Sequence, residues 1–172
     1  MFDRLVDLII QFAELFRFWY VLQPYEQGVL VRLGKFVRVM EPGFHWVAPL
    51  SVDVVHYESV VPTTHSLGNE SITTKDGKAV SFHAVVTFQI ADIEKVLLSV
   101  HDTDHALVDA CRGEVARTLM AHTWDEIVQD SIYDDLTKAC RKRGWRWGIE
   151  VMSVQLAGLS LARNIRLISN GV

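Results

Sequence analysis

The sequence is poor in cysteine, which excludes two common classes of small domain. Its 172 residues contain two cysteines, Cys111 and Cys140. Two are too few for a disulfide framework, and neither belongs to a Cys-x-x-Cys motif or to a cluster of cysteines and histidines. We therefore expect neither structural zinc nor disulfide exchange, and we interpret both cysteines as small buried apolar side chains rather than nucleophiles.

An excess of positive charge is also missing. Lysine and arginine number 17 against 21 aspartates and glutamates, which leaves a formal net charge of −4. Because phosphate binding needs clustered positive charge, this balance argues against nucleic acid as the main partner. At 49% hydrophobic and 22% charged residues, the chain has the composition of one folded domain with a substantial core.

Long charge-free runs are absent near the N-terminus. The longest extends from Phe18 to Tyr25, well short of the roughly 18 residues that a membrane-spanning helix needs. Acidic residues at positions 3, 7 and 14 interrupt the apolar stretch that a secretory signal would require, and no small-residue cleavage site follows. We therefore expect neither a spanning helix nor a signal peptide in this region.

What the first 22 residues do have is amphipathic spacing. At about 100° per residue the polar side chains gather on an arc of roughly 140°, and the rest of the circumference is apolar. The stretch ends in an aromatic run, Phe-Trp-Tyr-Val-Leu, that is apolar all round. This pattern is typical of a helix lying in the membrane interface, with aromatic rings at headgroup level. The predicted membrane-facing residues are Phe2, Leu5, Leu8, Ile9, Phe12, Leu15, Phe16, Trp19 and Tyr20. The alternative is a first helix that docks on the protein's own core or on a neighbouring subunit.

From Pro24 onward, turns rich in glycine and proline separate strand-like segments. The pattern predicts strands at 28–33 and 36–40 around a Gly34-Lys35 turn, two strands within 52–61, an irregular connection to about Ser71, and a strand over 80–90. A Lys-Asp-Gly-Lys sequence at 75–78 predicts a hairpin turn. Phe44, Trp46 and Val47 are predicted at the tip of a Pro-Gly loop, where they either make a second membrane contact or fold back onto the core.

After residue 91 the spacing of apolar residues becomes helical. Helices are predicted over 92–100, from 102 or 103 to about 122, and, after a capping box at 123–126, to about 143. A turn at 145–148 and a last strand over 149–156 follow. From Ser160 a short tail helix is predicted, with an oligomer contact formed by Leu161, Ile165 and Ile168 on one face.

Six of these segments, in this order, resemble the SPFH or band 7 family of stomatins, prohibitins, flotillins and the HflK/HflC regulators of proteases. They are PYEQGVLVRLGK at 24–35, EPGFHW at 41–46 with Pro49, TTKDGK at 73–78, AVVTFQI at 84–90, TWDE at 123–126 and WGIEV at 147–151. Each motif alone is weak, whereas six in the right order over residues 23–157 are a specific signature.

The resemblance implies an α+β fold in which a two-lobed SPFH/band 7 domain over 23–157, with lobes 23–91 and 92–157, follows a membrane-anchoring helix over 1–22. It also implies a non-enzymatic scaffold without a cofactor. Such a scaffold binds the lipid membrane, assembles as a homo-oligomer of many copies in a ring or cage, and modulates a membrane protein such as a protease or channel. The expected location is the inner or plasma membrane, with the domain on the cytoplasmic face.

The segment 158–172 is where relatives usually carry a long coiled coil, and only about 15 residues remain here. This predicts, as an alternative, a coil-less chain that co-assembles with a full-length relative and perturbs its assembly.

A membrane-bound hydrolase is a more remote alternative. His101 and His105 are spaced i, i+4, which can place two metal ligands on one helix face, but no third ligand or HExxH motif accompanies them. The sequence has no G-x-S-x-G elbow and no glycine-rich phosphate loop. We therefore predict no catalytic residue and no metal ligand, and we interpret the two histidines as part of a polar helix start with capping aspartates.

One cluster of basic residues stands out near the end of the last predicted long helix. It is either a solvated helix end or a contact for lipid headgroups or for an acidic partner surface. Its members are Lys138, Arg141, Lys142, Arg143 and Arg146.

Overall fold

The computed structural model describes residues 18–99 and 102–161, which fall into two compact units. The first unit holds 18–62 and 90–99, and the second holds 63–89 and 102–161. This division differs from the predicted lobes at 23–91 and 92–157, because the hairpin over residues 63–90 joins the last strand of the chain in one sheet. Sheets with antiparallel pairing and helices occupy largely separate stretches of the sequence, so the α+β class is confirmed.

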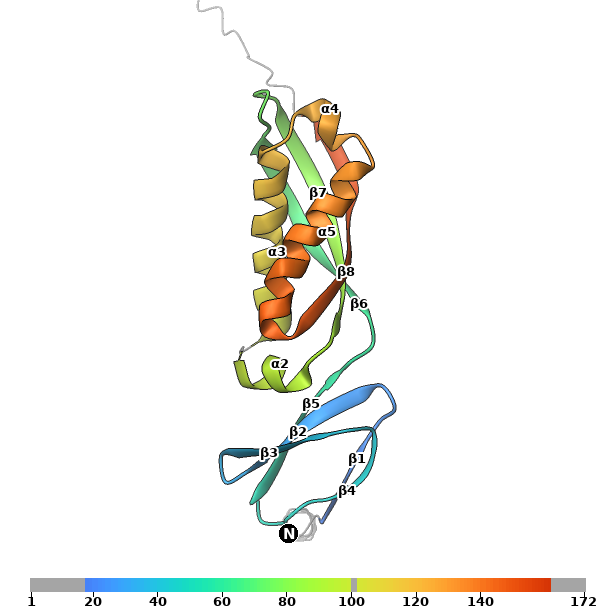
Figure 1. The fold of residues 1–172 in the computed structure, drawn as a ribbon, viewed down its shortest axis with the longest axis vertical. Helices are drawn as coiled ribbons and strands as arrows, with labels where there is room; N and C mark the ends of the chain where they lie inside the picture. The colour runs from blue at the N-terminus through green and yellow to red at the C-terminus, as the bar shows by residue number, and fades with distance from the viewer. Residues whose placement is uncertain (1–17, 100–101, 162–172) are drawn as a thin grey trace, which may run out of the picture. The chain divides into compact units, whose positions relative to one another are not determined.

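The first unit is built mainly from short strands (Figure 1). Its described elements are β1 (Trp19–Leu22), β2 (Glu26–Arg32), β3 (Lys35–Met40), β4 (Gly43–Trp46), β5 (Asp53–Ser59) and α2 (Ile93–Ser99). The strand order is β3-β2-β5 in one sheet, β1 pairs with β4 in another, and α2 packs against β2 and β5. Leu22, Leu30 and Met40 form a buried cluster in this unit. The two strands predicted within 52–61 are the single strand β5.

The prediction that the N-terminal helix extends to residue 22 is wrong, because residues 19–22 form the strand β1. The pairing with β4 is antiparallel from Trp19↔Trp46 to Leu22↔Gly43, and the Val47 N–H donates to the Phe18 carbonyl at 2.9 Å. Aromatic and β-branched residues fit a pleated, half-buried surface well, and here a partner strand supplies the backbone hydrogen bonds. The helix predicted over the preceding residues 1–17 lies outside the described part of the chain.

The β2–β3 hairpin turns through Leu33 and Gly34, one residue earlier than predicted. Arg32 and Lys35 are opposite each other, so the loop has two residues. Both loop residues have positive φ, 49° for Leu33 and 78° for Gly34, as in the type I′ turn that matches the twist of paired strands. Glycine adopts this conformation freely, whereas leucine is strained in it.

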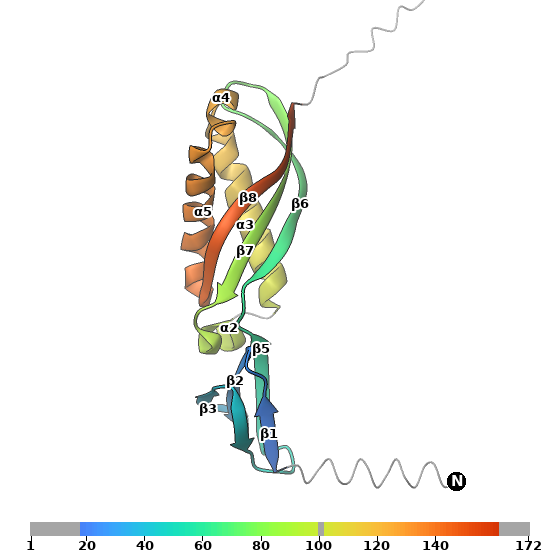
Figure 2. The same ribbon diagram turned by 90° about the vertical axis from the view of Figure 1, so that its right-hand side faces the viewer.

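The second unit is a sheet with a layer of helices on one face, as Figures 1 and 2 show. Its described elements are β6 (Thr63–Thr73), β7 (Ala79–Ile90), α3 (Thr103–Met120), α4 (Trp124–Ile127), α5 (Ser131–Gly144), η1 (Trp145–Trp147) and β8 (Ile149–Leu161). β7 is the middle strand between β6 and β8. Every second side chain of β7 from Val80 to Phe88 is buried, and α3 buries residues at helical spacing from Leu107 to Leu119. The core therefore lies between the sheet and the helices.

Residues 63–73, predicted as an irregular connection, form the regular strand β6. They pair with β7 from Thr63↔Phe88 to Thr73↔Ala79, with a register shift between Ser66 and Asn69. Polar side chains pair across the strands, as Ser71 Oγ and Ser81 Oγ do at 2.8 Å. The open face of this hairpin is polar, so β6 lacks the apolar alternation that reveals a strand in a sequence.

Two helix predictions also need correction. The capping box at Thr123 is confirmed, since its N–H donates to the Glu126 carboxylate at 2.8 Å, but the helix it opens ends at Ile127 and α5 begins separately at Ser131. No helix begins at Ser160, because β8 continues to Leu161. Of the predicted oligomer contact, Leu161 is therefore an exposed strand residue, and Ile165 and Ile168 lie outside the described residues.

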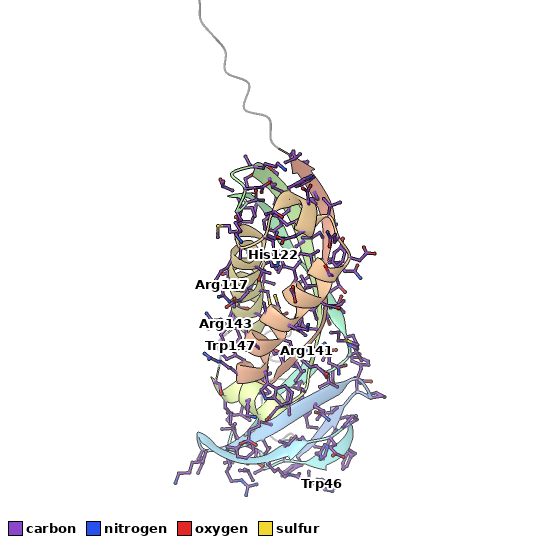
Figure 3. All side chains as sticks on the ribbon, turned by 45° about the horizontal axis from the view of Figure 1, so that its top comes forward. Trp46, Arg117, His122, Arg141, Arg143 and Trp147 are labelled. Atoms are coloured by element: carbon purple, nitrogen blue, oxygen red, sulfur yellow. The ribbon has the colours of Figure 1, made fainter. Side chains whose placement is uncertain are left out.

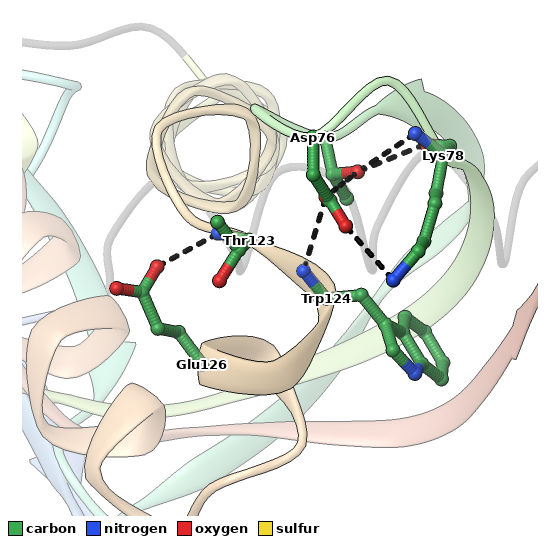
Figure 4. Close-up of polar contacts among 6 residues, drawn as sticks. Asp76, Lys78, Thr123, Trp124 and Glu126 are labelled. Atoms are coloured by element: carbon green, nitrogen blue, oxygen red, sulfur yellow. Dashed lines mark hydrogen bonds and ion pairs between the residues drawn. The ribbon is translucent and has the colours of Figure 1, made fainter.

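The hairpin turn predicted at 75–78 is confirmed, and Asp76 fastens it to the start of α4 (Figure 4). One carboxylate oxygen of Asp76 accepts from Thr74 Oγ1 at 2.6 Å and from the Trp124 N–H at 3.2 Å. The other lies 2.9 Å from Lys78 Nζ. Hydrogen bonds from the Thr74 hydroxyl and from Lys78 hold the pKa of Asp76 well below its ordinary value of 3.8. The turn thus joins the sheet to the helical layer through an ionised side chain.

Candidate functional site

The small β1–β4 sheet presents apolar side chains to solvent on one face. Residues directly opposite each other in an antiparallel pair share a face, as do residues two apart along a strand. Trp19 is opposite Trp46, and Val21 is opposite Phe44, so all four side chains project from the same side. Their exposed fractions are 49% for Trp19, 52% for Val21, 56% for Phe44 and 70% for Trp46. We call these four residues the aromatic face.

The geometry of the aromatic face is fixed by ring packing and by the loop that follows β4. The rings of Phe44 and Trp46 meet edge to face, with centroids 5.3 Å apart and an interplanar angle of 89°. This arrangement is favoured by the quadrupoles of the rings and needs no burial. Trp46 projects from the end of β4, where Figure 3 labels it.

Asp53 holds the loop after β4 to the rest of the first unit. Its carboxylate accepts two hydrogen bonds from the Arg32 guanidinium, at 2.6 and 2.9 Å, and one from the Ala48 N–H at 2.7 Å. The bond from Arg32 is the main reason why the pKa of Asp53 lies below its ordinary value. Because Arg32 and Asp53 are opposite each other on β2 and β5, the main sheet determines where β4 ends.

The opposite face of the β1–β4 sheet points into the protein, which divides the predicted membrane contacts into two groups. Trp19, Phe44 and Trp46 are exposed, and their contact with a membrane stays a prediction. Tyr20 and Val47 instead pack against the buried cluster around Leu22, and the Tyr20 ring lies 5.8 Å from that of Tyr57. The tip predicted at 44–47 is mostly the strand β4, and its alternation decides which side chains face outward.

The aromatic face includes one residue that was not among the predicted membrane contacts, and several predicted contacts lie outside the described residues. Val21 belongs to the aromatic face but was not predicted; the i, i+2 spacing of Trp19 and Val21 is the signal that could have identified it. The remaining predicted membrane-facing residues lie outside the described part of the chain, namely Phe2, Leu5, Leu8, Ile9, Phe12, Leu15 and Phe16. No helix within residues 18–99 and 102–161 is long and apolar enough to cross a bilayer.

The histidine pair considered as metal ligands is only half described, since His101 lies outside the described residues. His105 Nδ1 lies 2.8 Å from Asp102 Oδ1, and this contact raises the pKa of His105 above 6.5. Asp102 does not cap α3 with its side chain, contrary to the capping role predicted for it. Among the described residues no group of three or more His, Cys, Asp or Glu side chains is arranged to hold a metal ion.

The two cysteines lie in the core of the second unit, as predicted. Both are free and fully buried, and the Cys140 thiol lies 3.8 Å from the Cys111 carbonyl oxygen. Interaction with Cys111 and burial together raise the pKa of the Cys140 thiol well above its ordinary value. A buried, protonated thiol is a poor nucleophile.

The basic cluster lies on the last turns of α5 and on η1, and parts of it already serve the fold. Arg141 donates to the carbonyls of Val151 at 3.1 Å and Met152 at 3.4 Å. Arg143 lies 3.6 Å from Glu114, which also pairs with Arg117 of α3; Figure 3 labels both arginines. The choice between a solvated helix end and a contact for lipid headgroups or an acidic partner therefore concerns the other three cations of the cluster, Lys138, Lys142 and Arg146.

Comparison with known proteins places the chain in a family. The SPFH domain / Band 7 family matches residues 20–167. An uncharacterized protein of Archaeoglobus fulgidus is 25% identical over 150 residues, which cover 86% of this chain and 60% of that protein. HflK of Vibrio cholerae is 30% identical over 125 residues, 73% of this chain and 29% of HflK. A protein of Escherichia coli named "Modulator of FtsH protease HflK" is 28% identical over 112 residues, 65% of this chain and 26% of its own length. The chain thus spans three-fifths of the archaeal relative and under a third of the two HflK proteins.

Proposed function

Since the chain belongs to the SPFH domain / Band 7 family, we propose that it is a non-enzymatic scaffold that attaches to a membrane through its aromatic face. Many copies assemble into a ring or cage that organises the surrounding membrane patch. The assembly modulates an embedded client, a membrane protease in the first instance and a channel as the alternative. The domain stands on the cytoplasmic face of the inner or plasma membrane.

The observation that carries the proposal is the composition and exposure of the aromatic face. Scattered exposed apolar residues are normal, but a contiguous group that includes two tryptophans marks an interaction surface. Indole rings favour the headgroup level of a bilayer, where the ring is buried and its N–H stays wet. The face also follows directly in sequence on the predicted amphipathic segment, so both would meet the same membrane surface.

The proposed client is suggested by the named relatives. The Escherichia coli protein is named as a modulator of the protease FtsH, and it matches 65% of this chain. Modulation of a protease by a scaffold requires neither a nucleophile nor a metal in the scaffold. The described residues offer the aromatic face for attachment and leave the helical side of the second unit for protein contacts.

Fractionation of cells that express the full chain tests attachment and client binding together. The Phe44→Ser, Trp46→Ser double variant is compared with Trp145→Ser, which removes an indole of similar exposure, 66%, from η1. We expect the double variant in the soluble fraction, with loss of the co-purifying membrane protease, and the control in the membrane fraction. If the double variant is retained in the membrane fraction as fully as the control, the aromatic face does not contribute to attachment.

A further inference from the structure

Helix α5 carries opposite charges at its two ends. Its first turns together with the preceding N-cap residue, which we call the acidic end, comprise Asp130, Asp134 and Asp135. Its last turns together with η1, which we call the basic end, comprise Lys138, Arg141, Lys142, Arg143 and Arg146. The chain as a whole is acidic, so five cations within nine positions are a local concentration of charge.

Charges at both ends are left without an ion pair. Asp135 is partnered within its own unit by Lys138 at 3.8 Å and by His122 at 3.9 Å. Asp130 and Asp134 at the acidic end, and Lys142 and Arg146 at the basic end, make no ion pair with a described residue and are exposed. The helix dipole favours acids in a first turn and bases in a last turn, which explains their order along α5 but leaves their outward charge uncompensated.

The charges point away from the protein's own core. The buried residues of α5 are Ile132, Leu136, Cys140 and Gly144, which are four apart and share one side of the helix. Asp130, Asp134 and Lys138 are also four apart, but they lie on the solvent side. Along this outer side the sign of charge changes within about one helical turn, so each end attracts a partner surface of the opposite sign.

We infer that this outer side of α5 is a contact between copies of the chain, with the basic end of one copy against the acidic end of the next. The inference rests on the proposed function, in which the scaffold contains many copies. Each copy uses two different surfaces, so a free acidic end and a free basic end remain after every contact. Such a head-to-tail contact propagates until a ring closes, which an isologous dimer contact does not do.

The alternating signs favour a second copy over an anionic membrane. The acidic end lies directly beside the basic end on the same helix, so a uniformly negative surface would attract one and repel the other. A second copy carries the matching pattern by definition, and charge complementarity of this kind determines register and partner choice. No segment beyond the described residues is needed for the contact.

Two charge-reversal variants of the full chain test the contact. Asp130→Lys with Asp134→Lys reverses the charge of the two unpaired acids, and Lys142→Glu with Arg146→Glu reverses the charge of the two unpaired bases. Each protein, in mild detergent at low salt, is examined by sedimentation equilibrium against the 19.5 kDa mass of one chain. We expect at least a tenfold weaker self-association for each variant alone, and recovery to within threefold of the unmodified protein when the two variants are mixed. Loss of fold in either variant cannot produce this recovery.

A matched control variant and the oligomeric state of the unmodified chain show whether a negative result rules out the contact alone or the proposed assembly as well. Lys35→Glu with Arg38→Glu places the same charge change on exposed positions of β3, and its self-association should stay within twofold of the unmodified protein. If the unmodified chain is monomeric, the proposed assembly is wrong and the contact with it. If the unmodified chain assembles and either variant assembles equally well, or the mixture does not recover, this contact is wrong and the proposed scaffold is not affected.

Discussion

Replacing Trp46 by serine measures how much of the membrane affinity comes from the aromatic face. The side chain is 70% exposed, and a tryptophan presents about 250 Å² in total, so roughly 175 Å² can be removed from water. At about 25 cal/mol per Å² full burial would contribute about 4 kcal/mol, an upper bound. Insertion of half this area leaves about 2 kcal/mol, which corresponds to a roughly 30-fold weaker partition into the bilayer.

The assay is co-sedimentation with neutral phosphatidylcholine vesicles, read as the partition coefficient of the full chain. Trp145→Ser is the control, since it removes an exposed indole from η1, and its partition should change less than twofold. Because the aromatic face carries no charge, 1 M salt should leave binding of the unmodified protein intact. An equal loss in both variants, or release of the unmodified protein by salt, would refute the reasoning.

Three further predictions concern the fold. Leu33→Asn should raise the melting temperature by about 2–4 °C, as expected for about 1 kcal/mol, because asparagine tolerates the positive φ of this 77% exposed turn position. The control Leu98→Asn in α2, where φ is helical, should not raise it, and a lower melting temperature for Leu33→Asn would contradict the turn assignment. Asp76→Asn should lower the melting temperature at neutral pH, because the folded pKa of Asp76 is depressed: the stability that its carboxylate contributes is present above pH 3.8 and is lost as the pH falls toward the folded pKa. A difference in melting temperature between the two proteins that persists unchanged at pH 2 would contradict this. Cys111 and Cys140 should resist a thiol reagent at pH 8 until the protein is unfolded, because both are fully buried; rapid reaction of one thiol per native chain would contradict their placement.

Local patterns in the sequence were sufficient for much of the second unit. Alternation along residues 80–90, the Asp-Gly turn before them and the helical spacing of 103–120 each specify an element from neighbours in the chain. The six ordered motifs likewise identified the family, which the match over residues 20–167 confirms. These features depend on short-range spacing, which is visible in a single sequence.

The tertiary structure decided the candidate site. The aromatic run at 18–22 is compatible with either a helix or a strand, and only its pairing with β4, more than 20 residues away, makes it the strand β1. That pairing then sends Trp19 and Val21 outward and Tyr20 and Leu22 inward. The unit to which residues 63–89 belong was also decided by a distant strand, β8. Backbone hydrogen bonds between strands join residues far apart in sequence, and no periodicity within one segment records which partner completes them.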